Sequence, residues 1–391
     1  MKMSRNLWIL WIITTVLYSA WTDSRMGYLL TAVSVLLPLL TGVISRWILK
    51  KIRCEMSLSA YGEKDAEISG RLTVENKGFL PADRLICQVL CENLLTGERE
   101  TIPLRMAVPA KSKESTEFRM RSCHAGRIRV SVKKLICLDL FGLFRFQKKP
   151  ETEGSALGLV GPHIFSLETQ IAYGESANMD SDEYSMKKAG YDPSETFAIR
   201  EYQPGDRIRQ IHWKLTEKFD SLMVRDYGLP IQNTVLLLLE TGRMPGSEKA
   251  DPDCLDALAE AILSVSRELI SQQIVHSIGW QNHEENEFSC VEIEHDEDLN
   301  LALPGILGAV PGEDHSSVAD HYMESREQLE FAHMVVFTPA HQDSLGALAE
   351  QCLVTEVICS PQAAGYDQQN GVAIIGAAPQ ELPETLAYLE I

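Results

Sequence analysis

Two long apolar runs open the chain, at residues 7–20 and 28–44, and a short polar connection separates them. A helix of about 20 residues spans the hydrocarbon core of a bilayer. The first run reaches that length only when Trp21 and its interfacial neighbours are counted. No small-x-small cleavage site of a signal peptide follows the first run, whereas a second apolar run does. The pattern predicts a transmembrane helical hairpin over residues 1–54.

Basic residues outside the two runs predict the orientation of this hairpin. The connection between the runs carries one Arg and one Asp, whereas both outer flanks are basic. The positive-inside rule therefore places both ends, and the rest of the chain, in the cytoplasm. Nine cysteines without metal-like C-x-x-C pairs agree with a reducing compartment. The flanking basic residues are Lys2, Arg5, Arg46, Lys50, Lys51 and Arg53.

From residue 55 to about residue 150 the hydrophobic period changes to two. Ile68, Leu72 and Val74 alternate with polar residues, and the same alternation returns at residues 128–132. Turn-forming residues separate these runs at 76–78, 96–97, 109–111 and 124–126. Short alternating runs with turns between them are typical of a β-sandwich, which we predict for residues 55–150.

Residues 231–391 show longer apolar blocks in alternation with helical spacing. Residues 235–239 form a continuous apolar run, as expected for a strand that is covered on both faces. Residues 253–272 then repeat apolar side chains at helical spacing. This alternation predicts an α/β domain with a doubly wound parallel sheet. Further strands are expected at 274–280, 334–337, 357–359 and 372–375, helices at 299–307, 321–329, 345–352 and 379–389, and a solvated acidic loop at 295–298.

Between these domains, residues 151–230 are predicted to form a linker and a segment of special composition, 197–228. Pro204, Gly205 and Asp206 predict a tight turn, and charged residues of both signs surround Trp213. Three interpretations stay open from the residues alone. The segment is a structural network of buried polar groups, a docking surface, or an acid-base pair of Asp206 and His212 with Lys214 or Arg200 holding an anion.

The same segment carries a specific resemblance. Its REYQPGD, IHWK and LMVRDY sequences resemble the signature of the large prokaryotic family of unknown function numbered fifty-eight. The chain departs from the signature at residues 215–217 and at Ser221. An upstream element, residues 126–144, is also similar to that family, with Leu140 at its usual Pro. The matching positions are Arg200, Glu201, Tyr202, Pro204, Gly205, Asp206, Arg209, Ile211, Trp213, Lys214, Leu222 and Val224.

The resemblance implies that the α/β domain is von Willebrand factor A-like. Such domains hold a hard cation with an Asp-x-Ser-x-Ser sequence directly after the first strand. This chain has Glu240, Gly242 and Met244 at the three ligand positions. Glycine offers no side-chain oxygen and methionine offers a soft sulfur. We therefore expect a degenerate site that binds no divalent metal, and no cofactor.

The resemblance also implies partners. Proteins of this kind look like those encoded beside MoxR-type AAA+ ATPases, often with a membrane-anchored transglutaminase-like protein. An assembly or chaperone-like role would follow. The lipid bilayer is the other expected partner, because of the predicted hairpin.

Charge and missing motifs narrow the function further. The formal net charge is −19, with +6 over residues 1–54 and −24 over residues 235–391, which argues against nucleic acid as a partner. The chain lacks the P-loop, G-x-S-x-G and H-E-x-x-H motifs. Scattered histidines are expected at the surface and most cysteines in the core. We predict a membrane-anchored, non-catalytic binding or scaffold protein; the alternative is a hydrolase or anion-binding enzyme that uses Asp206, His212 and Lys214.

Overall fold

A computed structural model describes residues 2–150, 155–167, 184–190, 192–201, 214, 216, 222–230, 235–242, 251–282, 287–311, 317–324 and 331–387. This part of the chain is mixed α/β structure. It forms two compact units, unit 1 from Met1–His163 and unit 2 from Ile164–Ile391.

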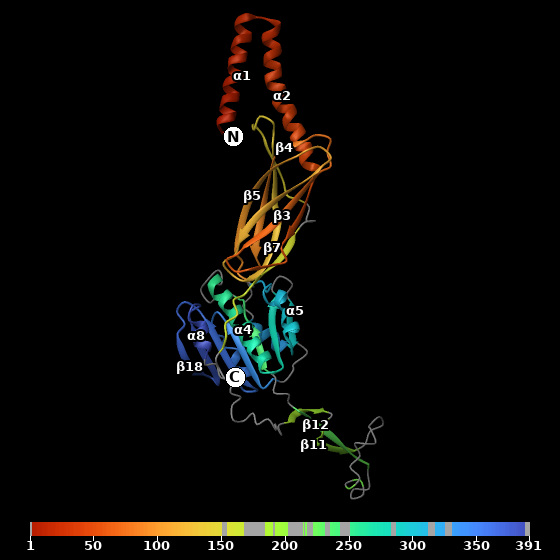
Figure 1. Ribbon diagram of the computed structural model, residues 1–391, viewed down its shortest axis with the longest axis vertical. Helices are drawn as coiled ribbons and strands as arrows, with labels where there is room; N and C mark the ends of the chain where they lie inside the picture. The colour runs from red at the N-terminus through yellow and green to blue at the C-terminus, as the bar shows by residue number, and fades with distance from the viewer. Residues whose placement is uncertain are drawn as a thin grey trace. The chain divides into compact units, whose positions relative to one another are not determined.

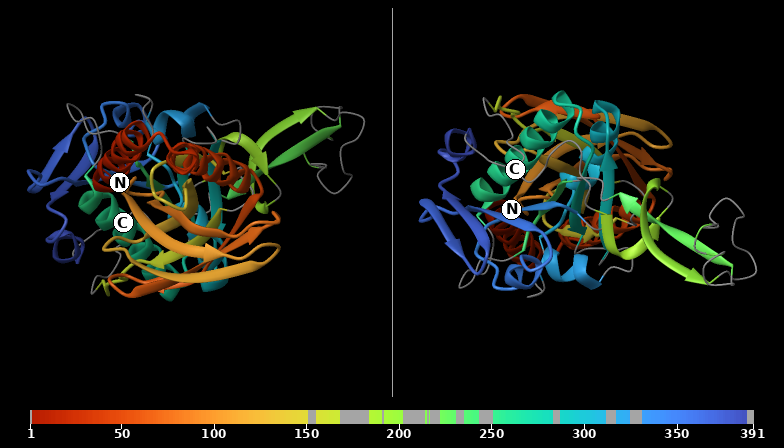
Figure 2. Two further views of the ribbon diagram at one scale, coloured as in Figure 1. Left: turned by 90° about the horizontal axis from the view of Figure 1, so that it is seen from above. Right: turned by 90° about the horizontal axis from the view of Figure 1, so that it is seen from below.

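Unit 1 begins with two long helices, α1 (Lys2–Thr22) and α2 (Arg25–Lys50), which lie side by side (Figures 1 and 2). The indole N–H of Trp11 donates to Oγ of Ser34 at 3.1 Å, so the helices are hydrogen-bonded to each other. A Cβ on Gly27 would lie 2.9 Å from Cα of Ser19, which explains glycine at this close approach. Within the described residues, α2 alone has the length and apolar composition to cross a membrane. A spanning role for α1 stays a prediction.

Two layers of strands follow in unit 1, and in the described residues their strand pairs are antiparallel except for β2 with β9, which is parallel. One sheet has the order β1-β3-β6, and the other has the order β2-β9-β7-β4-β5, with β8 paired to β7. Leu72 and Val74 of one sheet and Leu85 and Val89 of the other are at most 1% exposed and belong to one core. The alternating residues thus bury one face of each sheet, as in a sandwich. The strands are β1 (Ile52–Leu58), β2 (Tyr61–Glu63), β3 (Glu67–Asn76), β4 (Ala82–Asn93), β5 (Arg99–Val108), β6 (Lys113–Arg121), β7 (Gly126–Leu138), β8 (Arg145–Lys148) and β9 (Ala156–Gly161).

Unit 2 is built around a sheet of seven strands in the order β15-β14-β13-β16-β17-β19-β18. The five inner strands pair in parallel, and β15 and β18 pair antiparallel at the edges. Its elements are β13 (Val235–Leu239), α4 (Pro252–Ser271), β14 (His276–Asn282), β15 (Glu287–Ile293), α5 (Asp296–Ile306), α6 (Val318–Glu324), β16 (His333–Thr338), α7 (Leu345–Leu348), β17 (Leu353–Cys359), β18 (Gly365–Gln369), β19 (Val372–Ala377) and α8 (Leu382–Leu386).

Helices cover both faces of this sheet. Leu236 and Leu238 of β13 belong to a core that also contains residues of α6 and α7. Alternate residues of a strand point to opposite faces, and α4 contacts β13, β16 and β17, so α4 packs on the opposite face. Asp251 caps α4 by accepting the N–H of Asp253, and Pro252 occupies the first turn.

The structure corrects several expectations for unit 2. The sheet is not wholly parallel, because it has the two antiparallel edge strands β15 and β18. The acidic run at 295–298 is the start of α5 rather than a loop. Oδ2 of Asp298 accepts the N–H groups of His295 and Glu294 at 2.9 and 3.2 Å, which favours a helix start. The helix expected at 345–352 ends at Leu348.

A third, small sheet in unit 2 joins β10 (Tyr184–Gly190), β12 (Met223–Pro230) and β11 (Asp192–Glu201), in that order. β11 and β12 pair antiparallel, with Arg200 opposite Val224 and Glu201 opposite Met223. The two ends of the signature segment therefore meet as neighbouring strands.

Candidate functional site

The candidate site lies where the order of the central strands reverses. β13 has β14 on one side and β16 on the other, and all three are parallel. The connections that leave β13 and β16 at their carboxyl ends therefore diverge, and ligands of open α/β sheets bind at such a point. Glu240 follows β13 directly, and Thr338 ends β16. We call Glu240, Thr338, His341, Gln342 and Glu356 the carboxyl-edge cluster.

Glu240 is held in place by donors of its own chain. Its side chain carries a carboxylate that is buried, since the residue is 5% exposed. Oε1 accepts the N–H of Gly242 at 2.6 Å, and Oε2 accepts the N–H of Val318 at 2.6 Å. The amide of Gln342 donates to Oε2 at 3.4 Å. Both carboxylate oxygens are thus engaged by the loops around the crevice.

Gln342 connects the rest of the cluster. Its side-chain amide lies 3.2 Å from Oγ1 of Thr338, and its backbone N–H donates to Oε1 of Glu356 at 2.8 Å. Glu356 comes from the middle of β17, where its side chain is fully buried. One glutamine therefore joins two buried carboxylates that come from different strands.

His341 completes the cluster on its outer side. Nδ1 of His341 lies 2.6 Å from Oε2 of Glu356, and Nε2 lies 3.6 Å from Oδ1 of Asp343. The Asp343 side chain is fully exposed, whereas that of Glu356 is buried. Exposure of the side chains therefore increases from the buried Glu356, through the partly exposed His341, to Asp343 at the surface.

Burial sets the protonation behaviour of the two glutamates. Desolvation raises the pKa of the Glu240 carboxyl, and the N–H groups of Val318 and Gly242 oppose that rise. Desolvation likewise raises the pKa of Glu356, and the hydrogen bond from His341 opposes it. Both glutamates therefore keep a proton to a higher pH than an ordinary glutamate does.

The predicted degenerate metal position is described at Glu240 and Gly242, whereas Met244 lies outside the described residues. Gly242 acts as an N–H donor to Glu240 and brings no side-chain oxygen. In the described part of the chain, no three or more His, Cys, Asp or Glu side chains gather as metal ligands. Absence of metal binding stays a prediction.

The structure describes little of the predicted docking segment. Arg200 and Glu201 lie in β11, and the Lys214 side chain is exposed. The predicted acid-base pair of Asp206 and His212 lies outside the described residues. The residues outside the described part are Tyr202, Pro204, Gly205, Asp206, Arg209, His212 and Trp213.

Sequence reasoning missed Glu356 and misplaced some histidines and cysteines. His276 and His333, expected at the surface, are buried. Cys290, expected in the core, is exposed on the edge strand β15. A glutamate inside a mostly apolar strand, as at residue 356, is the signal that could have drawn attention to the cluster.

One family model matches a part of this chain. The family model described as "Protein of unknown function DUF58" matches residues 198–251, which supports membership of that family. No curated protein matches the chain.

Solved structures resemble the chain only distantly. The alkylpurine DNA glycosylase AlkC of Pseudomonas fluorescens, bound to DNA containing an abasic site analog, has a TM-score of 0.21 and 14% identity, over 38% of this chain and 42% of that one. A CARDB domain of Pyrococcus furiosus in complex with di-metal ions has a TM-score of 0.20 and 11% identity, over 28% and 91%. A β-glucosidase of Listeria innocua has a TM-score of 0.18 and 12% identity, over 26% and 16%. Similarity at this level assigns neither fold nor function.

Proposed function

We propose that this chain is a membrane-anchored, non-catalytic binding protein whose α/β unit is von Willebrand factor A-like. In this proposal, α1 and α2 form a transmembrane hairpin and both units lie in the cytoplasm. The unit 2 surface around the carboxyl-edge cluster binds another protein without a metal ion.

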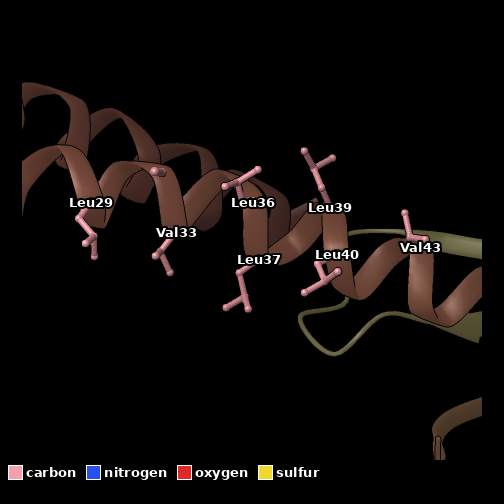
Figure 3. Close-up of a pocket in the computed structure, with 8 residues that line it drawn as sticks. Leu29, Val33, Leu36, Leu37, Leu39, Leu40 and Val43 are labelled. Carbon is pink, nitrogen blue, oxygen red and sulfur yellow. The ribbon is translucent and has the colours of Figure 1, made fainter. Parts of the chain in front are cut away.

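The anchoring part of the proposal is supported by α2. Its 26 residues extend over about 39 Å, which exceeds the hydrocarbon core of a bilayer. Leucine and valine side chains project from its surface (Figure 3), and those that Figure 3 labels are exposed. Such an apolar surface suits lipid tails. Arg46, Lys50, Lys51 and Arg53 at its end support the cytoplasmic orientation.

The fold part is supported by strand order. Numbered in chain order, the seven strands of the large sheet lie in the order 3-2-1-4-5-7-6, so the second and third strands lie on one side of the first strand and the other four lie on its other side. The third strand runs antiparallel at the edge. This topology agrees with the von Willebrand factor A-like fold that the family resemblance implies.

The observation that carries the functional part is the engagement of Glu240. A cation at this position would need carboxylate oxygens that are free to bind it. Here both oxygens already accept N–H groups of Gly242 and Val318 at 2.6 Å. The first metal-ligand position therefore joins Gly242 to the start of α6. A surface whose buried carboxylate is already engaged in internal hydrogen bonds suits protein binding without a metal ion.

For the partner we propose a MoxR-type AAA+ ATPase, with a membrane-anchored transglutaminase-like protein as a possible further member of the assembly. The family resemblance suggests this pairing, and the strongly acidic α/β unit offers a surface for a partner with basic side chains. The role would be assembly or maturation of other proteins.

The test is site-specific photo-crosslinking in native membranes. A photo-reactive amino acid replaces Asp343, which lies beside the carboxyl-edge cluster, or Tyr366, an exposed residue of the edge strand β18. We expect an AAA+ ATPase to crosslink at position 343 and not at position 366. Equal crosslinking at both positions, or none at 343, would contradict the proposed docking face.

Two variants in the signature segment separate docking from structure. Asp206→Ala and Trp213→Ala are compared with the parent chain for crosslinking at position 343 and for the amount of folded protein. Loss of crosslinking with unchanged folding assigns a docking role to this segment. Hydrolytic activity of the parent that disappears in Asp206→Ala would favour the enzyme alternative.

A further inference from the structure

The end of unit 1 next to α2 carries exposed apolar side chains in two loops. In the loop between β3 and β4, Phe79 is 69% exposed and Leu80 is 39% exposed. In the loop between β7 and β8, Leu140 is 60% exposed. Side chains of this size at loop tips are costly to leave in water. We therefore expect an apolar partner to cover them.

The loop at residues 139–144 is attached to both N-terminal helices. The rings of Phe141 and Trp8 of α1 have centroids 4.9 Å apart. A Cβ on Gly42 of α2 would lie 3.3 Å from the ring of Phe144, so the loop packs directly against the second helix. Leu140 therefore lies at the level of Trp8 and Gly42, which belong to the two apolar runs of the sequence.

Buried polar groups fix the conformation of this loop. Asp139 is fully buried, and its carboxylate accepts the N–H of Phe144 at 2.6 Å and the N–H of Phe141 at 3.3 Å. Gly142 has a φ of 69°, a conformation that glycine adopts without strain. The loop thus presents Leu140 in a fixed position.

The second loop is fixed in the same way. Asn76 is fully buried; its amide donates to the carbonyl of Leu80 at 2.9 Å, and its Oδ1 accepts the N–H of Gly78 at 2.9 Å. The ammonium group of Lys111 lies 4.3 Å from the centre of the Phe79 ring, from the neighbouring loop between β5 and β6. Two rigid apolar tips therefore stand at one end of unit 1.

Basic residues surround these tips, although the whole chain is acidic. Residues 46–53, 77–84, 109–112 and 139–145 together contain eight Lys or Arg and two Asp, against a net charge of −19 for the chain. One of the two acids, Asp139, is buried. Exposed apolar side chains together with nearby basic residues suit the interface of a membrane that contains anionic lipids.

We infer that this end of unit 1 is a second lipid-contacting surface: the loop 139–144 enters the interfacial layer of the bilayer beside α2, the loop of Phe79 and Leu80 reaches the headgroups beside Trp47 and Lys51 near the end of α2, and the basic residues bind anionic headgroups. The inference rests on the membrane anchoring proposed above. The loop 139–144 packs directly against α2, the helix whose apolar side chains Figure 3 shows. If so, the β-sandwich itself contacts the membrane, in addition to being joined to it through α2.

The experiment measures the depth of single spin labels in full-length protein in nanodiscs that contain phosphatidylglycerol and phosphatidylcholine. The labelled variants are Leu140→Cys, Leu157→Cys and Leu40→Cys, each in a chain with Cys123→Ser and Cys290→Ser, which removes the two exposed cysteines of the described residues. The chain without an added cysteine gives the background. The readout is accessibility of the label to oxygen, which enters lipid, relative to a water-soluble nickel chelate.

Leu157 and Leu40 are matched controls. Leu157 is 45% exposed and pairs through β9 with the start of β7, whereas Leu140 follows the end of β7. Leu157 pairs with Arg129, nine residues before the end of β7, so the strand separates the two positions by about 30 Å. Leu40 lies on the exposed apolar surface of α2 and reports on the anchoring itself.

We expect the label at 140 to resemble the label at 40, with high oxygen and low nickel accessibility, and the label at 157 to show the reverse. If position 40 is in lipid and position 140 is as open to nickel as position 157, the loop inference is wrong and the anchoring stands. If position 140 is closed to both reagents, protein covers the loop and the inference is also wrong. If position 40 is open to nickel, the membrane anchoring fails, and the inference fails with it.

Discussion

Acidification should destabilise unit 2 through the buried side chain of His333. This residue is 9% exposed on β16, and Nε2 of its ring lies 2.9 Å from Oγ1 of Thr355. Burial lowers the pKa of His333 from 6.5 to about 4. The folded protein therefore keeps this ring neutral at pH values where the unfolded chain binds a proton. The free energy of unfolding that the neutral His333 contributes is fully present above the pKa of the unfolded chain, 6.5, and is lost as the pH falls towards 4.

The size of the effect follows from the two pKa values. For a single site with pKa values of 6.5 unfolded and about 4 folded, lowering the pH from about 7.5 to about 5 removes about 2 kcal/mol of the free energy of unfolding. His333→Gln keeps a polar side chain that can reach Thr355 and does not titrate. The loss of about 2 kcal/mol between these pH values should therefore be absent from the variant.

Other buried groups also have shifted pKa values, and their effect on stability must be separated from that of His333. Burial also lowers the pKa of His276, which acts in the same sense. Burial raises the pKa values of Glu240 and Glu356, so the stability that these carboxyls contribute falls as the pH rises, which is the opposite sense. All three groups are common to the parent and the variant. Only the difference between the two proteins reports on His333.

The assay is a urea titration of the detergent-solubilised full chain with a brief peroxide pulse, followed by mass spectrometry of Met334. This methionine is 1% exposed on the same strand, so it is oxidised only when unit 2 unfolds. His295→Gln, at a histidine whose side chain is 72% exposed, is the control and should keep the parent's pH dependence. An identical pH dependence in His333→Gln and the parent would refute the assignment to His333.

Three further predictions concern topology, unit 1 and the crevice. In intact cells, a membrane-impermeant maleimide should leave the exposed Cys123 and Cys290 unlabelled and should label them after lysis; labelling before lysis would contradict the cytoplasmic orientation. Asn93→Ala should lower the free energy of unfolding of unit 1 by about 2–3 kcal/mol, because the buried amide donates to the Ala125 carbonyl and accepts the N–H of Leu95; a urea titration compares it with Thr101→Ala, at an exposed residue of β5. Calorimetric titration with Mg²⁺ should show no saturable micromolar binding, and binding that Glu240→Gln abolishes would overturn the metal-independent site.

The central strands and the longest helix of unit 2 were predictable because their own residues determine them. β13 is five apolar residues in a row, fully buried as expected for an inner parallel strand. α4 has an N-cap aspartate, a proline in its first turn and apolar residues at helical spacing. In unit 1, the alternation in β3 gave the buried face directly. Local pattern and tertiary burial agree at these elements.

The edge strands and the candidate site were not predictable in the same way. β18 is exposed at all five positions, and β15 has no regular alternation, so neither carries a burial signal. The buried state of His276 depends on Ser266, ten residues away, and that of His333 on Thr355, 22 residues away. The carboxyl-edge cluster joins residues from three segments, and only the folded sheet brings them together.

The position of Glu240 has a consequence for where a partner can bind. A glutamate side chain is one methylene longer than the aspartate of an Asp-x-Ser-x-Ser site, and here its carboxylate bonds to Val318, 78 residues away in the sequence. That bond ties the end of β13 to the start of α6, and Gln342 ties both to the connection after β16. Because Glu240 is buried and its carboxylate is engaged in these internal bonds, the proposed partner would meet His341 of the carboxyl-edge cluster and Asp343 beside it. Through the 2.6 Å contact between His341 and Glu356, such a partner would respond to the protonation of Glu356, whereas Glu240 would act only by joining Gly242 to the start of α6.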